Sequence, residues 1–490
     1  MAVIKVVDPI TRIEGHLKVT LVIDNAVNGT VTDAQLTGNM YRGFENFLVG
    51  RDPLDAALIT QRVCGVCPTA HGISAVLAMD DAANVQATPK GAMMRNIIHG
   101  AEYFHSHILH SYHLALLDYI DMAIASGGAL NKGPWAPTYG GDRRIGGADL
   151  ERLVGNYVTA LAMRRKAHSA GAILAGKQPH AASIIGGGCT ATPSAADIGQ
   201  IRSLVQELIT FTTDVYAPDM QMIFNDYYSD YFSLGVGSGK LLSYGAFRQG
   251  TGSTNTMLIK RGIYDGSSVQ HLMDQNLIVE DTANSWYTGP EGLHPSNGQT
   301  NQDETKAAGY SWLKAPRYKT DGTNKDVYEV GPLARMVIGG DYPAQISVAD
   351  RELARPVEAL KVLNAMLGWL DALEADPTGP SFIPYDTKPE TSGIGLTEAI
   401  RGAIGHWVNY DANGKVGHYQ IVTPTCWNCS PIDANGVHGT MEQALIGTPI
   451  QNADTPVEAL RVIHSYDPCL ACAVHVIDGD GQTLKNCIVQ

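Results

Sequence analysis

A C-x-x-C cysteine pair lies near each end of the chain, and a fold that uses both pairs must bring these ends together. Cys64 and Cys67 lie in RVCGVCPTAH, and Cys469 and Cys472 lie in SYDPCLACAVH, about 400 residues further along. Four thiolates in one pocket form a soft ligand set that suits transition metals. We therefore expect the fold to join these two segments around a metal ion.

A third pair, Cys426 and Cys429, leaves the choice of ligands open as far as spacing alone is concerned. Eight cysteines in 490 residues are too few for a disulfide scaffold. Structural zinc sites usually combine pairs about 15 to 20 residues apart. The long separation therefore disfavours structural zinc without excluding it, and buried cysteines that bind nothing also stay open.

The residues that flank the two outer pairs favour a metal centre with a chemical role. Arg62 and His71 surround the first pair, and Asp467 and His475 surround the second. Charged and hydrogen-bonding groups around a thiolate cluster balance its negative charge and tune the metal. A purely structural site seldom needs so many of them.

The composition excludes nucleic acid as a partner. The chain has 35 Lys and Arg against 49 Asp and Glu, a net charge of −14, and it contains no basic run. Nucleic-acid binding requires clustered Lys and Arg.

No apolar run approaches the roughly 18 to 20 residues that span a bilayer, and the first residues do not have the pattern of a secretory signal. The low content of charged residues, 17%, indicates that a partner covers part of the surface.

Hydrophobic periodicity predicts an α+β fold that is mainly α, with a core of long helices, peripheral short strands and an irregular lobe. We interpret the chain as one large domain, and residues 393–407 as a glycine-punctuated turn. Most of the five histidines between residues 90 and 122 are expected to be buried polar groups. The predicted segments are strands in 1–50, a helical core in 51–225 and 342–475 with long helices at 90–122, 148–176, 195–224 and 348–374, and the lobe at about 226–340.

Motifs along nearly the whole chain resemble the large subunit of nickel-iron hydrogenases. Besides the two cysteine segments, they are DPITRIEGH, MYRGFENFLVGRDP, HILHSYHL, KAPRY, EVGPLARM and GLTEAIRGAIGHW. The segments PTAH, HSHILHSYHL and SYDPCLACAVH are most similar to the nickel-iron-selenium branch, which has selenocysteine where this chain has Cys469. The possibility that position 469 is a selenocysteine written as cysteine stays open. The resemblance implies the hydrogenase large-subunit fold and the reversible oxidation of dihydrogen to protons and electrons.

The resemblance also implies the metals and their ligands. Cys64, Cys67, Cys469 and Cys472 would hold nickel, and Cys67 and Cys472 would also hold an iron that carries carbon monoxide and cyanide. A magnesium or similar divalent cation would be bound by Glu45, the backbone carbonyl of Ile421 and His475. In this interpretation Cys426, Cys429, Cys189 and Cys487 bind no metal.

Further residues receive roles from the same resemblance. Glu14 corresponds to a proton-transfer glutamate, which would accept a proton from Cys469. Arg401 corresponds to an arginine above the metals, with Asp467 as its partner. The residue before Arg401 is Ile400, where the family commonly has proline, so we expect a less constrained backbone there. Residues expected around the metals are Ser106 above them, His71 as a donor to a cysteine sulfur, Arg62, and Thr425 as a donor to an iron-bound cyanide.

The resemblance also implies partner proteins for electron transfer and for maturation of the metal centre. The chain has no cysteines to spare for iron-sulfur clusters, so a small subunit must carry them and pass electrons to a membrane or soluble cytochrome. Nickel-insertion factors and a maturation endopeptidase that cleaves after His475, removing residues 476–490, are also implied. A periplasmic or membrane-associated location through the small subunit is expected, with a cytoplasmic one left open. The alternatives are a zinc-stabilised interaction protein and a metal-free relative in respiratory complexes, against which the intact cysteine pairs argue.

Overall fold

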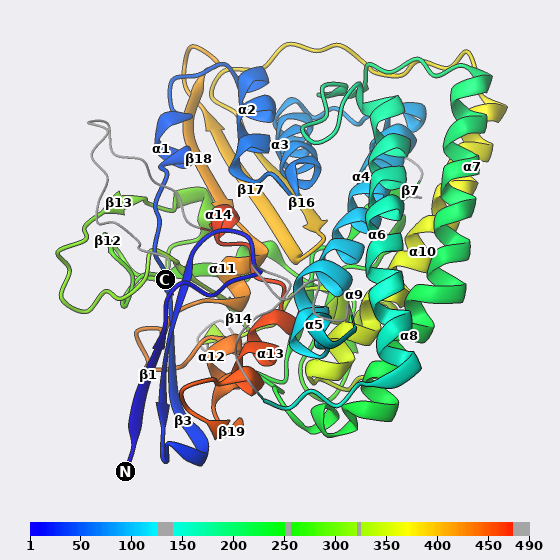
Figure 1. The fold of residues 1–490 in the computed structure, drawn as a ribbon. Coiled ribbons are helices and arrows are strands. Elements are labelled where there is room, and N and C mark those ends of the chain that lie inside the picture. Colours follow the sequence, from blue (N-terminus) through cyan, green and yellow to red (C-terminus); the bar gives the residue numbers. More distant parts are fainter. Residues whose placement is uncertain (126–140, 250–255, 321–324, 474–490) are drawn as a thin grey trace.

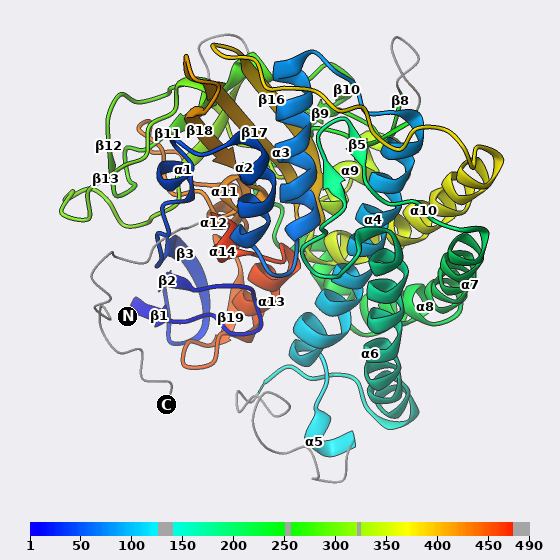
Figure 2. The same ribbon diagram turned by 90° about the horizontal axis from the view of Figure 1, so that it is seen from above.

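A computed structural model describes residues 1–125, 141–249, 256–320 and 325–473 (Figure 1). A bundle of long helices occupies one side, an N-terminal sheet the other, and a three-stranded sheet lies between them near the short C-terminal helices (Figures 1 and 2). The α+β class expected from the sequence is confirmed. Among the helices described, none combines the length and apolar character needed to cross a bilayer.

The N-terminal sheet contains a strand from the far end of the chain. Its order is β1 (Val3–Val7), β2 (Leu17–Ile23), β3 (Val27–Gly38) and β19 (Pro449–Asn452), all antiparallel. In β2, LKVTLVI, every second side chain is buried, as expected for a strand with one face on a core. Because β19 pairs with β3, the sheet already brings the C-terminal segment beside the N-terminus.

The helices expected from periodicity form the bundle, and three of the four long ones begin with a polar side-chain cap. Thr88 accepts from the backbone N–H of Gly91, Ser194 forms a capping box with Asp197, and Ser347 caps the next long helix. Beyond its last residue, α4 continues as a π-helical segment, Leu109–Ala115. The long helices are α4 (Pro89–Ile108), α6 (Gly147–Ala175), α7 (Ala195–Phe211) and α10 (Val348–Ala375).

Shorter helices connect the bundle to the rest of the chain. Those before the bundle are α1 (Phe44–Phe47), α2 (Pro53–Thr60) and α3 (Pro68–Ala83). Those within and after it are α5 (Met122–Ala125), α8 (Ala217–Gln221), α9 (Pro332–Gly339), α11 (Pro424–Asn428), α12 (Thr440–Leu445), α13 (Val457–Ser465) and α14 (Leu470–Ala473).

The prediction of a glycine-punctuated turn at residues 393–407 is wrong. This segment forms most of an antiparallel hairpin, β16 (Ser392–Ala399) and β17 (Gly402–Tyr410), which β18 (Val416–Val422) extends. The glycines serve close packing, because a Cβ at Gly393 or Gly395 would lie 1.9 Å from a backbone oxygen of α3. They therefore allow α3 to lie directly on β16, an arrangement that glycine content alone does not distinguish from a turn.

Short strands, irregular segments and the helix α9 make up the described part of residues 226–340, where the lobe was expected. They lie along the bundle and over the three-stranded sheet (Figure 2). The strands here and just before the lobe are β4 (Ile184–Ile185), β5 (Gly188–Cys189), β6 (Leu241–Ser243), β7 (Ala246–Gln249), β8 (Thr256–Ile259), β9 (Gly262–Tyr264), β10 (Val269–Gln270), β11 (Ile278–Asp281), β12 (Tyr287–Thr288), β13 (Asn301–Gln302), β14 (Ala315–Lys319) and β15 (Lys325–Asp326).

Candidate metal centre

Three of the four cysteines expected to bind metal meet in one buried cluster. The sulfur atoms of Cys64, Cys67 and Cys469 all lie within 4.8 Å of one another, and those of Cys64 and Cys469 are 3.4 Å apart. The backbone of Cys472 belongs to α14, close in sequence to Cys469, but its side chain lies outside the described residues. The fold therefore joins the two distant segments as their spacing predicted.

The local backbone prepares the first cysteine pair for the thiolate form. Cys64 follows a 3-10 turn, Gln61–Val63, and Cys67 is the N-cap of α3. The backbone N–H groups of Val66 and Cys67 both donate to Cys64 Sγ, at 3.2 Å each. Such donors at a helix N-terminus stabilise a thiolate.

The N-terminal segment carrying Glu14 is attached to the second cysteine segment by backbone pairing. Glu14 donates its N–H to the carbonyl of Pro468 at 3.3 Å and accepts from Leu470 at 2.8 Å. Gly15 has φ +77°, and a Cβ there would lie 2.6 Å from the backbone nitrogen of Ala471. Only glycine allows this approach.

The Glu14 carboxylate contacts Cys469 directly. Its Oε2 atom accepts from Cys469 Sγ at 3.1 Å and from the backbone N–H of Ala471 at 3.0 Å. Burial, and secondly the charge of Cys64, raises the pKa of Glu14 above its usual value. A carboxylate with a raised pKa next to a thiol is suited to exchange a proton with it.

Arg401 and Asp467 form a buried ion pair beside the thiols. Arg401 donates through Nη2 to Asp467 Oδ1 at 2.9 Å and through Nε to the Asp467 carbonyl at 2.8 Å. Among the described residues, Arg401 Nη1 has no hydrogen-bond partner although it is buried. The negative charges of Asp467 and of the three cysteines help to keep the pKa of Arg401 well above its usual value despite burial. A fixed cation with one free donor therefore lies beside the thiol cluster.

The backbone before Arg401 is held in place without the proline. Arg335 donates to the carbonyl of Ala399 at 2.8 Å and to that of Ile400 at 2.6 Å. Arg335 itself is fixed by two buried carboxylates, Glu358 and Glu398. These side-chain hydrogen bonds restrain the two peptide groups before Arg401, while a backbone less constrained than one with proline at position 400 stays a prediction.

The other residues expected around the metals differ in their positions. Thr425 Oγ1 accepts from the backbone N–H of Cys469 at 3.0 Å, so it supports the second cysteine segment. His71 Nδ1 lies 3.3 Å from His406 Nε2, and burial lowers the pKa of His71 to about 4, which keeps it neutral. In the described part of the chain, the buried His71 Nε2 and Ser106 Oγ have no partner. The side chain of Arg62 is exposed.

Two of the three ligands expected for magnesium lie together. Glu45 Oε1 accepts from the backbone N–H of Ile421 at 3.0 Å, and Oε2 accepts from Thr300 at 2.5 Å. His475, the third ligand, lies outside the described residues. The Glu45 carboxylate is thus placed beside the Ile421 peptide, while the cation site stays a prediction.

The third cysteine pair has the environment of ordinary buried thiols. Thr423 donates to Cys426 Sγ at 3.3 Å, and Cys429 Sγ contacts the sulfur of Met441 at 3.9 Å. Burial raises the pKa of Cys426 to about 11. Metals bind thiolates rather than thiols, and the absence of a metal at this pair stays a prediction.

Sequence reasoning did not identify Arg42, which connects the two cysteine segments. Its guanidinium donates to the carbonyl of Val63, immediately before Cys64, and to the carbonyl of Ala471, immediately before Cys472, the latter at 2.5 Å. The MYRGFEN motif contains this residue, but a motif gives no information about a contact across 429 residues.

Two buried carboxylates were missed for the same reason. Glu102 accepts from the backbone N–H groups of Thr69 and Ala70, at 2.7 and 3.1 Å, and so fixes the start of α3. Asp118 pairs with Arg12 and His464, which holds the segment before Glu14 against α13. Both lie in helical stretches whose periodicity indicated only burial.

Taken together, the residues present fit a soft transition metal. Three buried sulfurs converge, one of them with two N–H donors, beside a guanidinium that has an unused N–H and a carboxylate that can take up a proton. Soft sulfur ligands suit nickel and iron as well as zinc, but a structural zinc site has no need for the proton acceptor and the cation.

Comparison with known proteins identifies the family. The family model described as nickel-dependent hydrogenase matches residues 42–133, 125–345 and 339–475, and a HoxL-like model matches residues 6–37. The periplasmic [NiFeSe] hydrogenase large subunit of Desulfomicrobium baculatum is 36% identical, covering 97% of this chain and 95% of the relative. The uptake hydrogenase large subunit of Rhizobium leguminosarum bv. viciae is 32% identical over 98% and 96%.

Solved structures agree with this assignment. The reduced Ni-Fe-Se hydrogenase of D. vulgaris Hildenborough has a TM-score of 0.90 and 36% identity to this chain, over 97% of this chain and 100% of that one. The Dm. baculatum [NiFeSe]-hydrogenase has the same TM-score and identity. With the thiol cluster and the full-length similarity in hand, we conclude that this chain belongs to the nickel-dependent hydrogenases and is a catalytic large subunit of that family.

Proposed function

We propose that Cys64, Cys67, Cys469 and Cys472 hold nickel, and that Cys67 and Cys472 also hold an iron with carbon monoxide and cyanide ligands. The observation that supports this most is the convergence of three buried thiols on the Arg401 guanidinium and the Glu14 carboxylate. When bound, this centre supplies the site at which dihydrogen is split into protons and electrons.

The side chains then divide the proton chemistry between them. Cys469 Sγ holds a proton and passes it over 3.1 Å to Glu14 Oε2. The raised pKa of Glu14 brings it closer to that of a thiol, which lowers the free-energy difference for the transfer. Arg401 provides fixed positive charge beside the reacting atoms, and Asp467 holds its orientation.

The remaining groups support this centre. His71, Thr425 and Ser106 shape its surroundings, and Arg62 lies at the exposed edge of the first cysteine pair. Glu45, the Ile421 carbonyl and His475 bind magnesium or a similar cation, whose preference for oxygen ligands and waters fits this small ligand set.

Electrons leave through an iron-sulfur small subunit and pass to a membrane or soluble cytochrome. The relatives named above are a periplasmic and an uptake hydrogenase large subunit, and this supports a periplasmic or membrane-associated enzyme. Nickel-insertion factors load the centre, and an endopeptidase then removes residues 476–490.

Metal analysis tests the proposal against the zinc-stabilised interaction protein. Purified active protein is expected to contain about one nickel and one iron per chain, because four thiolates complete the pair of sites. Infrared spectra are expected to show carbon monoxide and cyanide bands. Zinc alone, without these bands, would contradict the proposal.

Cleavage of the C-terminal segment is tested by intact mass. Active enzyme is expected to end at His475, since the segment after it must leave for the new terminus to reach the cation site. Protein grown without nickel provides the matched control and is expected to retain Gln490. Active enzyme that still carries Gln490 would overturn this prediction.

Arg42→Ala is expected to lower the nickel content of the purified protein by at least about twofold. The substitution removes two charge-assisted hydrogen bonds that hold the carbonyls before Cys64 and Cys472, each worth roughly 1.5–3 kcal/mol. Nickel per chain and the thermal midpoint are the measurements.

The control is Arg51→Ala, since within the described residues the side chain of the exposed Arg51 donates only to the nearby carbonyl of Phe47. Wild-type nickel content and melting temperature in Arg42→Ala would show that the connection between the two segments does not depend on Arg42.

A further inference from the structure

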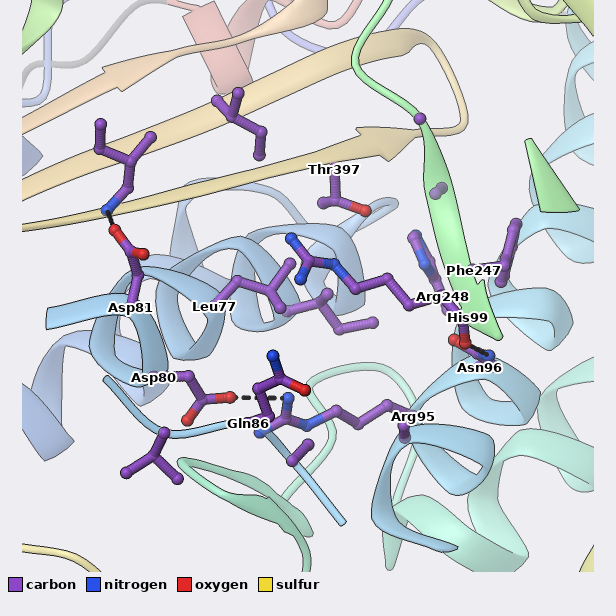
Figure 3. A pocket seen from close by; sticks show the side chains of 18 of the residues that line it. Leu77, Asp80, Asp81, Gln86, Arg95, Asn96, His99, Phe247, Arg248 and Thr397 are labelled. Carbon is purple, nitrogen blue, oxygen red and sulfur yellow. Dashed lines mark hydrogen bonds and ion pairs between the residues drawn. The ribbon is translucent and has the colours of Figure 1, made fainter. Parts of the chain in front are cut away.

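A second polar site lies away from the thiols, in a cavity of about 200 Å³ between α3, α4, β7 and β16 (Figure 3). Leu77, Phe247 and Leu396 give it an apolar wall, and charged and amide side chains surround the rest. Among the residues that the structure describes, no cysteine and none of the groups given a role in dihydrogen oxidation lines it. A concave site with an apolar wall and a few converging polar groups has the character of a small-molecule site.

One charged pair in the wall is fully occupied by the protein. Arg95 donates to Asp80 at 3.0 Å and to the carbonyls of Gly188 and Ile185. The other Asp80 oxygen accepts from the N–H of Gly187 and from the Tyr385 hydroxyl, both at 2.7 Å. This pair therefore builds the cavity and is not free to bind a ligand.

Arg248 lines the cavity from β7 with an exposed side chain (Figure 3). Within the described residues, no ion pair or side-chain hydrogen bond involves it, whereas its carbonyl is fixed by Asn96 Nδ2 at 3.0 Å. The preceding residue, Phe247, has φ +58°, a left-handed conformation that is costly for an aromatic residue. Such a conformation needs support from the surroundings and concentrates at binding sites. Here it turns the strand so that Arg248 faces the cavity.

Charged groups of the cavity wall act on Arg248: the carboxylates of Asp80 and Asp81 raise its pKa, and the guanidinium of Arg95 lowers it. Asp81 Oδ2 accepts from the backbone N–H of Ile394 at 2.9 Å, so this carboxylate is partly committed to β16. Burial lowers the pKa of Arg261, and the positive charge of Arg248 lowers it further. These two cations therefore lie close enough to repel each other. The Arg248 side chain itself is exposed, and its guanidinium stays charged at neutral pH.

His99 supplies an unused acceptor at the inner end of the cavity. It is 2% exposed, and its Nε2 atom has no hydrogen-bond partner among the described residues. Its other ring nitrogen bonds to the carbonyl of Glu398, and burial lowers the pKa of His99 to about 3. The ring is therefore neutral and offers a lone pair at Nε2. Buried polar atoms normally have a hydrogen-bond partner, so this lone pair calls for a donor.

We propose that this cavity binds a small organic carboxylate that carries a hydroxyl group. The carboxylate pairs with the Arg248 guanidinium, the hydroxyl donates to His99 Nε2, and the hydrocarbon part lies on Leu77, Phe247 and Leu396. Guanidinium–carboxylate pairing is bidentate and specific. This one class of ligand would satisfy the buried acceptor of His99, pair with the cation at the mouth of the cavity and cover the apolar wall.

The test uses the metallated large and small subunit complex with 4-hydroxybenzoate as the probe, measured by titration calorimetry. Saturable binding is expected below about 10 mM. Arg248→Gln is expected to weaken it at least about tenfold, as is replacing the probe by the uncharged 4-hydroxybenzamide. Arg202→Gln, on a surface arginine paired with Asp371, is the matched control and is expected to bind as wild type.

A second variant tests whether His99 Nε2 accepts a hydrogen bond from the hydroxyl group of the probe. His99→Leu is expected to bind benzoate, which lacks the hydroxyl, about as well as wild type does, and to lose the preference for 4-hydroxybenzoate. Unchanged melting temperatures and dihydrogen oxidation in Arg248→Gln show that the fold is intact. If wild type does not bind the probe at about 10 mM, or if Arg248→Gln binds it equally well, the proposal is overturned.

Discussion

Replacing Glu14 with glutamine is expected to slow dihydrogen oxidation by about two to four orders of magnitude while nickel and iron contents stay at wild-type values. The amide has the size of the carboxylate, and its oxygen can still accept from the N–H of Ala471. It cannot take up a proton from Cys469 Sγ, the group 3.1 Å from Glu14 Oε2. The substitution therefore removes the proton acceptor and leaves the structure around it in place.

Metal content and turnover, measured on the same preparation, separate this effect from a failure of assembly. Exchange between deuterium gas and water adds a second readout, since it requires protons to leave the site. Glu207→Gln is the control, because Glu207 pairs with Lys166 on the surface. Fast turnover or exchange in fully metallated Glu14→Gln would mean that protons leave by another group.

Replacing Arg401 with glutamine is expected to lower turnover at least about 100-fold and to destabilise the protein by about 3–5 kcal/mol. Turnover falls because the fixed positive charge beside the thiolates is lost. Stability falls because Asp467, which is 4% exposed, keeps a negative charge without its main partner. Arg401→Lys keeps the charge but not the two-point contact with Asp467, so its loss of stability is expected to be smaller.

A double variant separates the two effects. Arg401→Gln combined with Asp467→Asn removes the unpaired charge, so most of the stability is expected to return while turnover stays low. Denaturant midpoints and turnover with an artificial electron acceptor are the measurements, with Arg202→Gln as the surface control. Recovery of turnover in the double variant would contradict a role for the Arg401 charge.

The helices were predictable because each buries one face with a period close to 3.6 residues, and this is a local property. The predictions for α6 and α10 are confirmed almost to the residue. The hairpin of β16 and β17 was not predictable, because two of its glycines, Gly393 and Gly395, allow the approach of α3 and do not form a local turn. In the sequence, a glycine that allows close packing cannot be told apart from a glycine that forms a turn.

In the candidate site too, some features were predictable from the sequence and others were not. The cysteine spacing and flanking residues predicted that two remote segments meet, and Cys64, Cys67 and Cys469 do meet. Motif resemblance selected Glu14 and Arg401, but their distances to Cys469 and Asp467 exist only in the folded chain. Arg42 and Glu102 were missed, since their partners are backbone groups, which have no identity in a sequence.

By itself, the sequence determined the chemistry available to this protein: soft thiolates in two pairs, an acidic surface and helices of known extent. Only the tertiary structure decided which groups act together. It raised the pKa of the buried Cys426, placed a proton acceptor against Cys469, and left His99 with an unused polar atom beside a cavity that Arg248 also lines. The physical reason is that pKa, hydrogen bonding and metal affinity depend on neighbours within a few ångströms, and in this fold those neighbours come from opposite ends of the chain.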